Sequence, residues 1–271
     1  MRLLHIGDVV GTPGRKIIVK AVKALKAHYG LTAVCANAEN AAAGSGLTPK
    51  IYEELISAGV DCITMGDHVF RRKEIIPVLE RESRIVRPAN YPPESPGRGH
   101  VLLTLTHGAR CAIINLLGRV FMQPVDCPFH AVDKILRTLP ADIKIIFVDF
   151  HAEATSDMQA MGRYLDGRVT AVLGTHTHVA TADEQIFPGG TAFQCDVGMT
   201  GPMDSIIGRK IDRVLETMTT ARPTIYDVAE NDIRLHGTIV DFEYTTGKAT
   251  AIQRLTLNME EAEKLAASVP S

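Results

Sequence analysis

Residues 1–11 read MRLLHIGDVVG, and this stretch sets the pattern that decides the fold. A short apolar run at residues 3–6 ends at Gly7 and Asp8, so a buried strand is followed at once by a polar side chain. Runs of the same kind recur at residues 33–36, 62–65, 143–148 and 169–173. We therefore expect five buried strands, each with polar or glycine residues at its carboxyl end.

Helical patterns lie between the first of these runs. Apolar residues recur at three- and four-residue spacings from Ile18 to Tyr29, and Gly30 follows as a C-terminal stop. Thr48 and Pro49 fit a helix N-cap followed by proline at the first helical position. Because strands and helices alternate here, parallel strand pairing is expected in this part of the chain.

Two later stretches predict antiparallel hairpins. The first joins residues 101–106 to 111–117, and the second joins residues 238–244 to 249–257. Antiparallel strands are thereby added to parallel ones, which favours a mixed two-sheet sandwich with outer helices over a doubly wound sheet. A last helix is expected from about Glu260. We expect one domain over residues 1–271, since no linker or internal repeat divides the sequence.

The composition describes an ordinary globular protein with a sizeable core. Hydrophobic residues make up 45% and charged residues 22% of the chain. The net charge of −2 gives no field that would attract bulk nucleic acid or an anionic membrane, whereas a small phosphate ligand is compatible with it. The five scattered cysteines favour a reducing compartment. We find neither a signal peptide nor the roughly 18 apolar residues of a membrane helix, so a cytoplasmic location is expected.

Polar side chains that can bind metals follow all five predicted strands. The carboxyl edge of an open α/β sheet is where ligands gather, so these side chains should converge there. Taken alone, each cluster has an ordinary interpretation: an aspartate can cap a helix, a Glu-Asn pair fits a turn, and loop histidines make ordinary hydrogen bonds. Their recurrence at equivalent strand ends favours a metal site. The candidate ligands are Asp8, Glu39, Asn40, Asp67, His151, His176 and His178.

The donor set indicates the kind of metal and the reaction. Carboxylate, amide and imidazole groups without thiolate suit Mn, Fe or Zn. Two such ions lower the pKa of a bridging water and stabilise the charge of a phosphoryl transition state. A leaving alkoxide then needs a proton, and His68, next to a candidate ligand, is the predicted donor. The alternative is that His68 only orients a ligand.

Other kinds of site fit the sequence less well. Neither a dinucleotide-binding G-x-G-x-x-G nor a P-loop is present, and no G-x-S-x-G elbow supports a serine hydrolase. Gly7, Gly11 and Gly14 are instead expected to let the backbone approach the site closely. Cys195 could serve as a nucleophile, but a buried structural thiol is the favoured interpretation.

Seven motifs, in order along nearly the whole chain, resemble the YmdB-like family, a branch of the calcineurin-like metallophosphoesterases. They are Gly7-Asp8-Val9-Val10-Gly11, Glu39-Asn40-Ala41-Ala42, Met65-Gly66-Asp67-His68, Val86-Arg87-Pro88-Ala89-Asn90, Asp149-Phe150-His151-Ala152-Glu153-Ala154-Thr155-Ser156, Gly174-Thr175-His176-Thr177-His178-Val179 and Asp196-Val197-Gly198-Met199-Thr200-Gly201-Pro202.

The resemblance implies a four-layer α/β/β/α sandwich with mixed sheets and a dinuclear centre, often of iron. It implies phosphodiesterase activity on 2′,3′- and 3′,5′-cyclic nucleotides, through a two-metal-activated hydroxide and His68 as proton donor. Glu39 would bridge the ions. The residues completing the first ion's ligands would be Asp8, Asn40 and His178, and those completing the second's would be Asp67, His151 and His176.

Two positions depart from the expected motifs. Val10 stands where the broader superfamily usually has a histidine, and Asn40 fills that place within this branch. Asp67 stands where the family usually has asparagine. Its added charge is expected to hold metal more tightly, to make the bound water less acidic and to raise the pKa of His68 by pairing with it.

The sequence therefore predicts a metal-dependent phosphodiesterase, and one alternative stays open. A metal-bound regulator would bind a nucleotide or a partner through the same site with little catalysis, because Asp67 could weaken turnover. The predicted partner is a small phosphodiester, either a cyclic nucleotide or a short RNA end. A homo-oligomer is compatible with a soluble enzyme of this kind.

Overall fold

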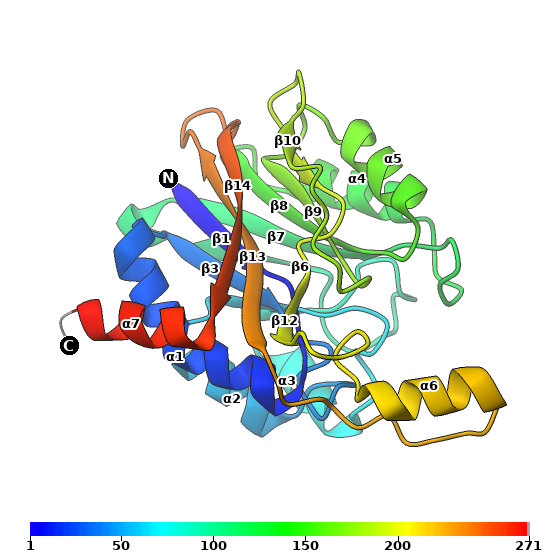
Figure 1. The fold of residues 1–271 in the computed structure, drawn as a ribbon. Coiled ribbons are helices and arrows are strands. Elements are labelled where there is room, and N and C mark those ends of the chain that lie inside the picture. The colour runs from blue at the N-terminus through cyan, green and yellow to red at the C-terminus, as the bar shows by residue number, and fades with distance from the viewer. Residues whose placement is uncertain (270–271) are drawn as a thin grey trace.

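Two β-sheets lie face to face in the computed structural model, which describes residues 1–269, and helices cover both outer sides (Figure 1). One sheet has eight strands, in the order β2 (Asp8–Val9), β12 (Met199–Pro202), β13 (Ile233–Phe242), β1 (Arg2–Ile6), β3 (Ala33–Asn37), β4 (Cys62–Thr64) and β5 (Ile85–Val86), with β14 (Ala249–Asn258) paired to β13. The other has six, in the order β10 (Gln185–Ile186), β11 (Ala192–Gln194), β9 (Ala171–Thr175), β8 (Ile145–His151), β7 (Arg110–Leu117) and β6 (His100–Thr104).

The helices form the two outer layers. The eight-stranded sheet is covered by α1 (Gly11–Tyr29), α2 (Pro49–Ser57), the turn η1 (Lys73–Ile75), α3 (Ile76–Arg81) and α7 (Met259–Ser268). The six-stranded sheet is covered by α4 (Pro128–Thr138) and α5 (Thr155–Tyr164). The arrangement is the predicted four-layer α/β/β/α sandwich with mixed sheets, so the fold class is confirmed. Two further elements are the short turn η2 (Thr106–Gly108) within the β6–β7 hairpin and α6 (Ile211–Thr220), an arm that projects from the body (Figure 1).

Helix ends follow the local signals of the sequence. Gly30 adopts a left-handed conformation with φ 61° after α1, and its N–H donates to the carbonyl of Lys26. The Thr48 side chain accepts from the N–H of Ile51 at the start of α2, as the N-cap assignment predicted. Both predicted hairpins are present as β6–β7 and β13–β14. The parallel pairing expected early in the chain is found for β1, β3, β4 and β5.

The space between the sheets changes from apolar to polar along the strands. Leu3 on β1 packs in the inter-sheet core, whereas its neighbour Leu4 packs under the helices, because side chains alternate between the two faces of a strand. Further along, His5, Asn37 and Asp149 occupy inter-sheet positions and are buried. The apolar part of this layer holds the sheets together, and the polar part lies under the candidate site.

The predicted bounds of two strands were wrong. The strand expected at residues 143–148 is β8 and continues to His151, and the strand expected at 169–173 is β9 and continues to Thr175. The two strands pair in register from Phe147 opposite Ala171 to His151 opposite Thr175. Asp149, His151 and Thr175 continue the strands because their side chains face a buried network of hydrogen bonds between the sheets rather than solvent.

Gly7 and Gly14 lie against another segment of the backbone. A Cβ atom at Gly7 would lie 1.8 Å from the carbonyl oxygen of Gly198, and one at Gly14 would lie 2.3 Å from that of Thr200. These glycines therefore let two backbones pack together at β12, rather than letting the backbone approach a ligand. Among the described residues, no helix is both long and apolar enough to span a membrane. One domain over residues 1–271 stays a prediction, and residues 270–271 lie outside the described range.

Candidate metal centre

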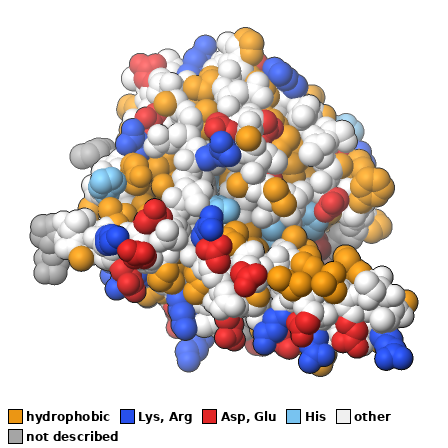
Figure 2. Space-filling view, viewed as in Figure 1, with side chains coloured by type: hydrophobic (Ala, Val, Ile, Leu, Met, Phe, Trp, Pro, Cys, Tyr) orange, Lys and Arg blue, Asp and Glu red, His pale blue; other side chains and the backbone are white. Residues whose placement is uncertain are grey.

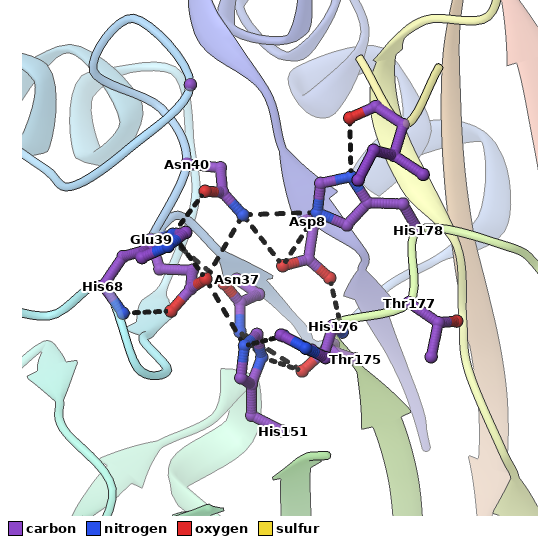
Figure 3. Close-up of polar contacts among 12 residues, drawn as sticks. Asp8, Asn37, Glu39, Asn40, His68, His151, Thr175, His176, Thr177 and His178 are labelled. Atoms are coloured by element: carbon purple, nitrogen blue, oxygen red, sulfur yellow. Dashed lines mark hydrogen bonds and ion pairs between the residues drawn. The ribbon is translucent and has the colours of Figure 1, made fainter. Parts of the chain in front are cut away.

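The candidate ligands come from the ends of both sheets and meet at one point; Figure 3 shows all of them except Asp67, which lies in one group with Glu39, His151 and His176. Asp8 follows β1, Glu39 and Asn40 follow β3, and Asp67 follows β4, all on the eight-stranded sheet. On the six-stranded sheet, His151 is the last residue of β8, while the His176-Thr177-His178 loop follows β9. The two sheets pack face to face, so loops that are more than a hundred residues apart in the sequence converge at the same end of the sandwich.

Four of these side chains form a compact group. One ligand atom each from Glu39, Asp67, His151 and His176 lies within 4.8 Å of the others. The Nε2 atom of His151 is 3.3 Å from Oε1 of Glu39 and 3.3 Å from Oδ1 of Asp67. The Nδ1 atom of His176 is 3.0 Å from Nε2 of His151. This is the set that the resemblance implied for the second ion.

The remaining three side chains lie on the other side of Glu39. The Nε2 atom of His178 is 3.7 Å from Oδ1 of Asp8 and 3.3 Å from Nδ2 of Asn40. The same amide nitrogen is 3.3 Å from Oε1 of Glu39. Coordination would require the amide oxygen of Asn40 on this side, and that oxygen now faces His68. Glu39 touches both groups, as a bridging ligand should.

The charge of this cluster fits a cation. Asp8 and Glu39 are fully buried, and within residues 1–269 only histidines pair with them and with Asp67. Oδ1 of Asp67 is buried and accepts no hydrogen bond of good geometry. A Cβ atom at Gly66 would lie 2.3 Å from Oε2 of Glu39 and 2.4 Å from Nε2 of His151. Buried carboxylates are costly unless a cation balances them, so the donor set fits bound metal.

The pKa shifts of these side chains describe the same charge balance. Burial, assisted by the charge of Glu39, raises the pKa of Asp8 to about 7. Burial opposes ionisation of Glu39 too, but His151 and His68 outweigh it and hold the pKa of Glu39 well below its usual range. Burial and the charge of His151 lower the pKa of His176 to about 4, and burial lowers the pKa of His178. Both imidazoles are therefore neutral near pH 7, which is the form that binds metal.

A network between the sheets holds His151 in place. Its Nδ1 atom is 2.9 Å from the hydroxyl of Thr175, which donates to Oδ1 of Asp149 at 2.7 Å. The side-chain amide of Asn37 donates to Oδ2 of Asp149 at 3.2 Å, and the hydroxyl of Thr64 donates to the same oxygen. Nε2 of His151 is thereby left to face Glu39 and Asp67. Such outer partners fix the orientation of a metal-binding histidine.

This network was not predicted from the sequence. Thr175 and Asp149 lie in motifs whose candidate ligands are their neighbours, and Asn37 directly follows the strand expected at residues 33–36. Their signal was present, since each is a polar residue at an inward-facing position of a mostly apolar strand. Which face of a strand is inward becomes clear only when the second sheet is in place.

His68 lies at the open side of the cluster. Its Nδ1 atom is 2.8 Å from Oδ1 of Asn40 and 3.1 Å from Oε1 of Glu39, and its side chain is 25% exposed. Nε2 is 3.8 Å from Oδ2 of Asp67. Burial alone lowers the pKa of His68, but Glu39 and then Asp67 outweigh it, so the pKa is raised. Histidine side chains reach the surface between the body and the α6 arm (Figure 2).

Comparison with known proteins places this architecture in a family. A sequence model described as "YmdB-like protein" matches residues 4–255. The chain belongs to the YmdB-like family. A 2′,3′-cyclic-nucleotide 2′-phosphodiesterase of Bacillus subtilis (strain 168) is 46% identical over 258 residues, which cover 95% of this chain and 97% of that protein.

Two solved structures resemble this YmdB-like protein closely. The crystal structure of a hypothetical protein from Thermus thermophilus has a TM-score of 0.89 and 42% identity, covering 95% of this chain and 99% of the other. A Mycoplasma pneumoniae protein described as a novel phosphatase has a TM-score of 0.89 and 33% identity, covering 95% and 93%. The predicted family is confirmed, and the chain is an enzyme of the phosphoesterase class. The roles of the individual side chains stay predictions.

Proposed function

We propose that this YmdB-like protein is a dinuclear metal-dependent phosphodiesterase that opens cyclic nucleotides. The observation that carries the proposal is the meeting of three carboxylates and three histidines around Glu39, with no lysine or arginine among the described residues to balance their charge. The name of the Bacillus subtilis relative supports a 2′,3′-cyclic nucleotide as substrate. A 3′,5′-cyclic nucleotide is a second proposed substrate, and the proposed setting is the cytoplasm.

Each ion would be held from both sheets. Asp8, Asn40 and His178 would hold the first, and Asp67, His151 and His176 the second, with Glu39 shared between them. When bound, the two ions would supply Lewis acidity to the phosphoryl group and a water of lowered pKa as the nucleophile. We propose iron for both positions, with manganese or zinc as substitutes, because the donors accept all three.

The chain's own part in the chemistry is to place a proton. Nδ1 of His68 faces Oε1 of Glu39 and the side-chain amide of Asn40, which would turn its oxygen to the ion, so Nε2 is the nitrogen left to face a substrate. Glu39 and Asp67 raise the pKa of His68, which favours retention of that proton. Nε2–H would donate it to the ribose oxygen that leaves phosphorus. Buried Glu39 and Asn40 fix the ring that carries the proton.

Metal analysis together with substrate assays tests the proposal. The purified protein should carry two ions per chain, and it should hydrolyse 2′,3′-cyclic AMP, 3′,5′-cyclic AMP and bis(p-nitrophenyl) phosphate. A chelator should abolish turnover, and added Mn²⁺ or Fe²⁺ should restore it. Absence of bound metal together with absence of turnover after metal addition would overturn the proposal. Tight nucleotide binding with negligible hydrolysis would favour a metal-bound regulator, the alternative that Asp67 suggested.

A further inference from the structure

The loop that carries two candidate ligands has an unfavourable backbone conformation. His176 has φ 114° and His178 has φ 66°, both in the left-handed region that residues other than glycine rarely adopt. Such conformations persist only where the surroundings hold them in place, and they cluster at functional sites. The loop must therefore be held by contacts outside the histidines themselves.

Asp196, which follows β11, makes those contacts. It is completely buried, and its Oδ2 atom accepts from both the N–H and the hydroxyl of Thr177, each at 2.8 Å. Its Oδ1 atom accepts from the N–H of Gly198 at 2.7 Å. Both carboxylate oxygens are thus satisfied by groups of the loop and of its own segment. Thr177 lies between the two histidines, so a single anchor fixes both of them.

The same segment also reaches the opposite sheet. The carbonyl of Gly198 accepts from the N–H of Asp8 at 3.1 Å, and Oδ2 of Asp8 accepts from the N–H of His176 at 3.0 Å. The N–H of Asp196 donates to the hydroxyl of Thr181 at 3.0 Å, which fixes the segment from behind. The segment at residues 196–198 therefore connects candidate ligands of the two sheets.

We propose that Asp196 is a positioning residue of the metal centre, which holds the His176-Thr177-His178 loop so that each histidine faces a different ion. This inference rests on the proposed function. Because one histidine serves each ion, loss of the anchor weakens the binding of both ions rather than of one. An aspartate that served only the fold would instead lower stability and leave metal affinity unchanged.

Two aspartate variants test the proposal through Mn²⁺ binding. Asp196→Asn keeps the size of the side chain but replaces one carboxylate oxygen with an NH₂ group, which cannot accept a hydrogen bond from the N–H of Thr177 or Gly198. We expect Mn²⁺ to bind about 10- to 100-fold more weakly at both positions, measured by calorimetry, with an altered electron paramagnetic resonance spectrum of the bound Mn²⁺. The Tm of the metal-free protein should fall as well, because the introduced amide nitrogen meets an N–H group, so the loss of Mn²⁺ affinity rather than the Tm decides the proposal. Asp166→Asn is the control, because Asp166 likewise accepts from a backbone N–H, that of Gly189, but bonds neither to the histidine loop nor to the segment at residues 196–198.

Thr177 provides a second test that does not depend on whether the Asp196→Asn variant folds. Thr177→Val removes the hydroxyl bond and keeps the backbone bond, so Mn²⁺ affinity should fall by a smaller factor, and Thr177→Ser should restore it. Unchanged Mn²⁺ affinity in Asp196→Asn and Thr177→Val would overturn the proposal. If the wild type binds Mn²⁺ but hydrolyses no phosphodiester, the proposed function fails. The role of Asp196 can still be tested in that case, by comparing the Mn²⁺ affinity of Asp196→Asn with that of the wild type. A wild type that bound no Mn²⁺ would overturn both.

Discussion

The two sheets bring different chemistry to the same point. The loops of the eight-stranded sheet supply Asp8, Glu39 and Asp67 together with the amide of Asn40, whereas the six-stranded sheet supplies only imidazoles. Asp8, Glu39 and Asn40 of the first sheet are buried and Asp67 is partly exposed, while the imidazole half depends on outer hydrogen bonds and on a backbone in a rare conformation. One sheet thus provides the negative charge and the other depends on the orientation of its histidines, so the two contributions can be removed by separate substitutions.

Glu39 is where the two halves meet, and its loss should have the largest effect. In Glu39→Gln we expect both ions to be lost or loosely held and turnover to fall to background, beyond the ~10²–10⁴-fold that a general acid contributes. The number of ions per chain after dialysis measures the loss of metal, and kcat measures the loss of turnover. Glu53→Gln, an exposed glutamate of α2, is the control. Retention of two ions in Glu39→Gln would show that the halves do not share a bridge.

His68 separates metal binding from proton donation. His68→Ala should keep both ions, because its ring is not among the candidate ligands, while turnover falls by roughly 10²–10⁴-fold. The change should be greatest for substrates with poor leaving groups. His130→Ala, at an exposed histidine of α4, should behave as wild type. Unchanged rates in His68→Ala would remove the assignment of proton donor.

A buried pair under the site tests how firmly the two halves are joined. Nε2 of His5 on β1 is 3.5 Å from Oδ2 of Asp149 on β8. Burial alone lowers the pKa of His5, but its neighbours Asp149 and Cys35 raise it to about 10, above the ordinary value of 6.5. His5→Gln should therefore cost roughly 3 kcal/mol of unfolding free energy below pH 6.5.

The pH dependence of that cost follows from the sign of the shift. A raised pKa in the folded state adds stability that is fully present below the unfolded value and is lost as the pH rises through about 10. The gap between wild type and His5→Gln, measured by denaturant unfolding at several pH values, should shrink in that range. A gap that grew with pH would mean that His5 is neutral in the folded protein.

Thr175 provides the smallest expected change. Thr175→Val removes the hydroxyl between His151 and Asp149 and keeps the shape of the side chain. We expect about a 10-fold loss of metal affinity, confined to the ion that His151 would bind. Thr175→Ser should restore it. Equal losses at both ions would show that the network supports the whole centre rather than the ion that His151 would bind.

The sequence predicted the architecture and the candidate ligands better than it predicted their surroundings. Short apolar runs predict the strands, and the polar residues that follow them within a few positions, such as Asp8, Glu39 and Asp67, predict the candidate ligands. The residues that support the ligands cannot be predicted in this way. Asn37 and Thr175 acquire a role only when β8 and β9 pair and the two sheets pack together. The same holds for Asp196, whose partner Thr177 lies in another loop.

The bounds of β8 were predicted wrongly for a related reason. A polar residue was taken to end a strand, yet Asp149 and His151 continue the pairing with β7 and β9. Inter-sheet hydrogen bonds replace the water that such side chains lose on burial. The α6 arm was not predicted, although Ile211, Val214, Leu215 and Met218 recur at helical spacing; of these residues only Val214 is buried against the body.

Gly66 lies between Glu39 and His151, where the Cβ atom of any other residue would come within 2.4 Å of both side chains and fill the space in which the proposed ion would lie. Gly66→Ala is therefore the smallest change that would leave every donor in the chain while closing the space between them. Such a variant, checked by metal content and by Tm, would be a permanent apoprotein that needs no chelator. It would give nucleotide-binding studies a reference that cannot recruit ions from the buffer.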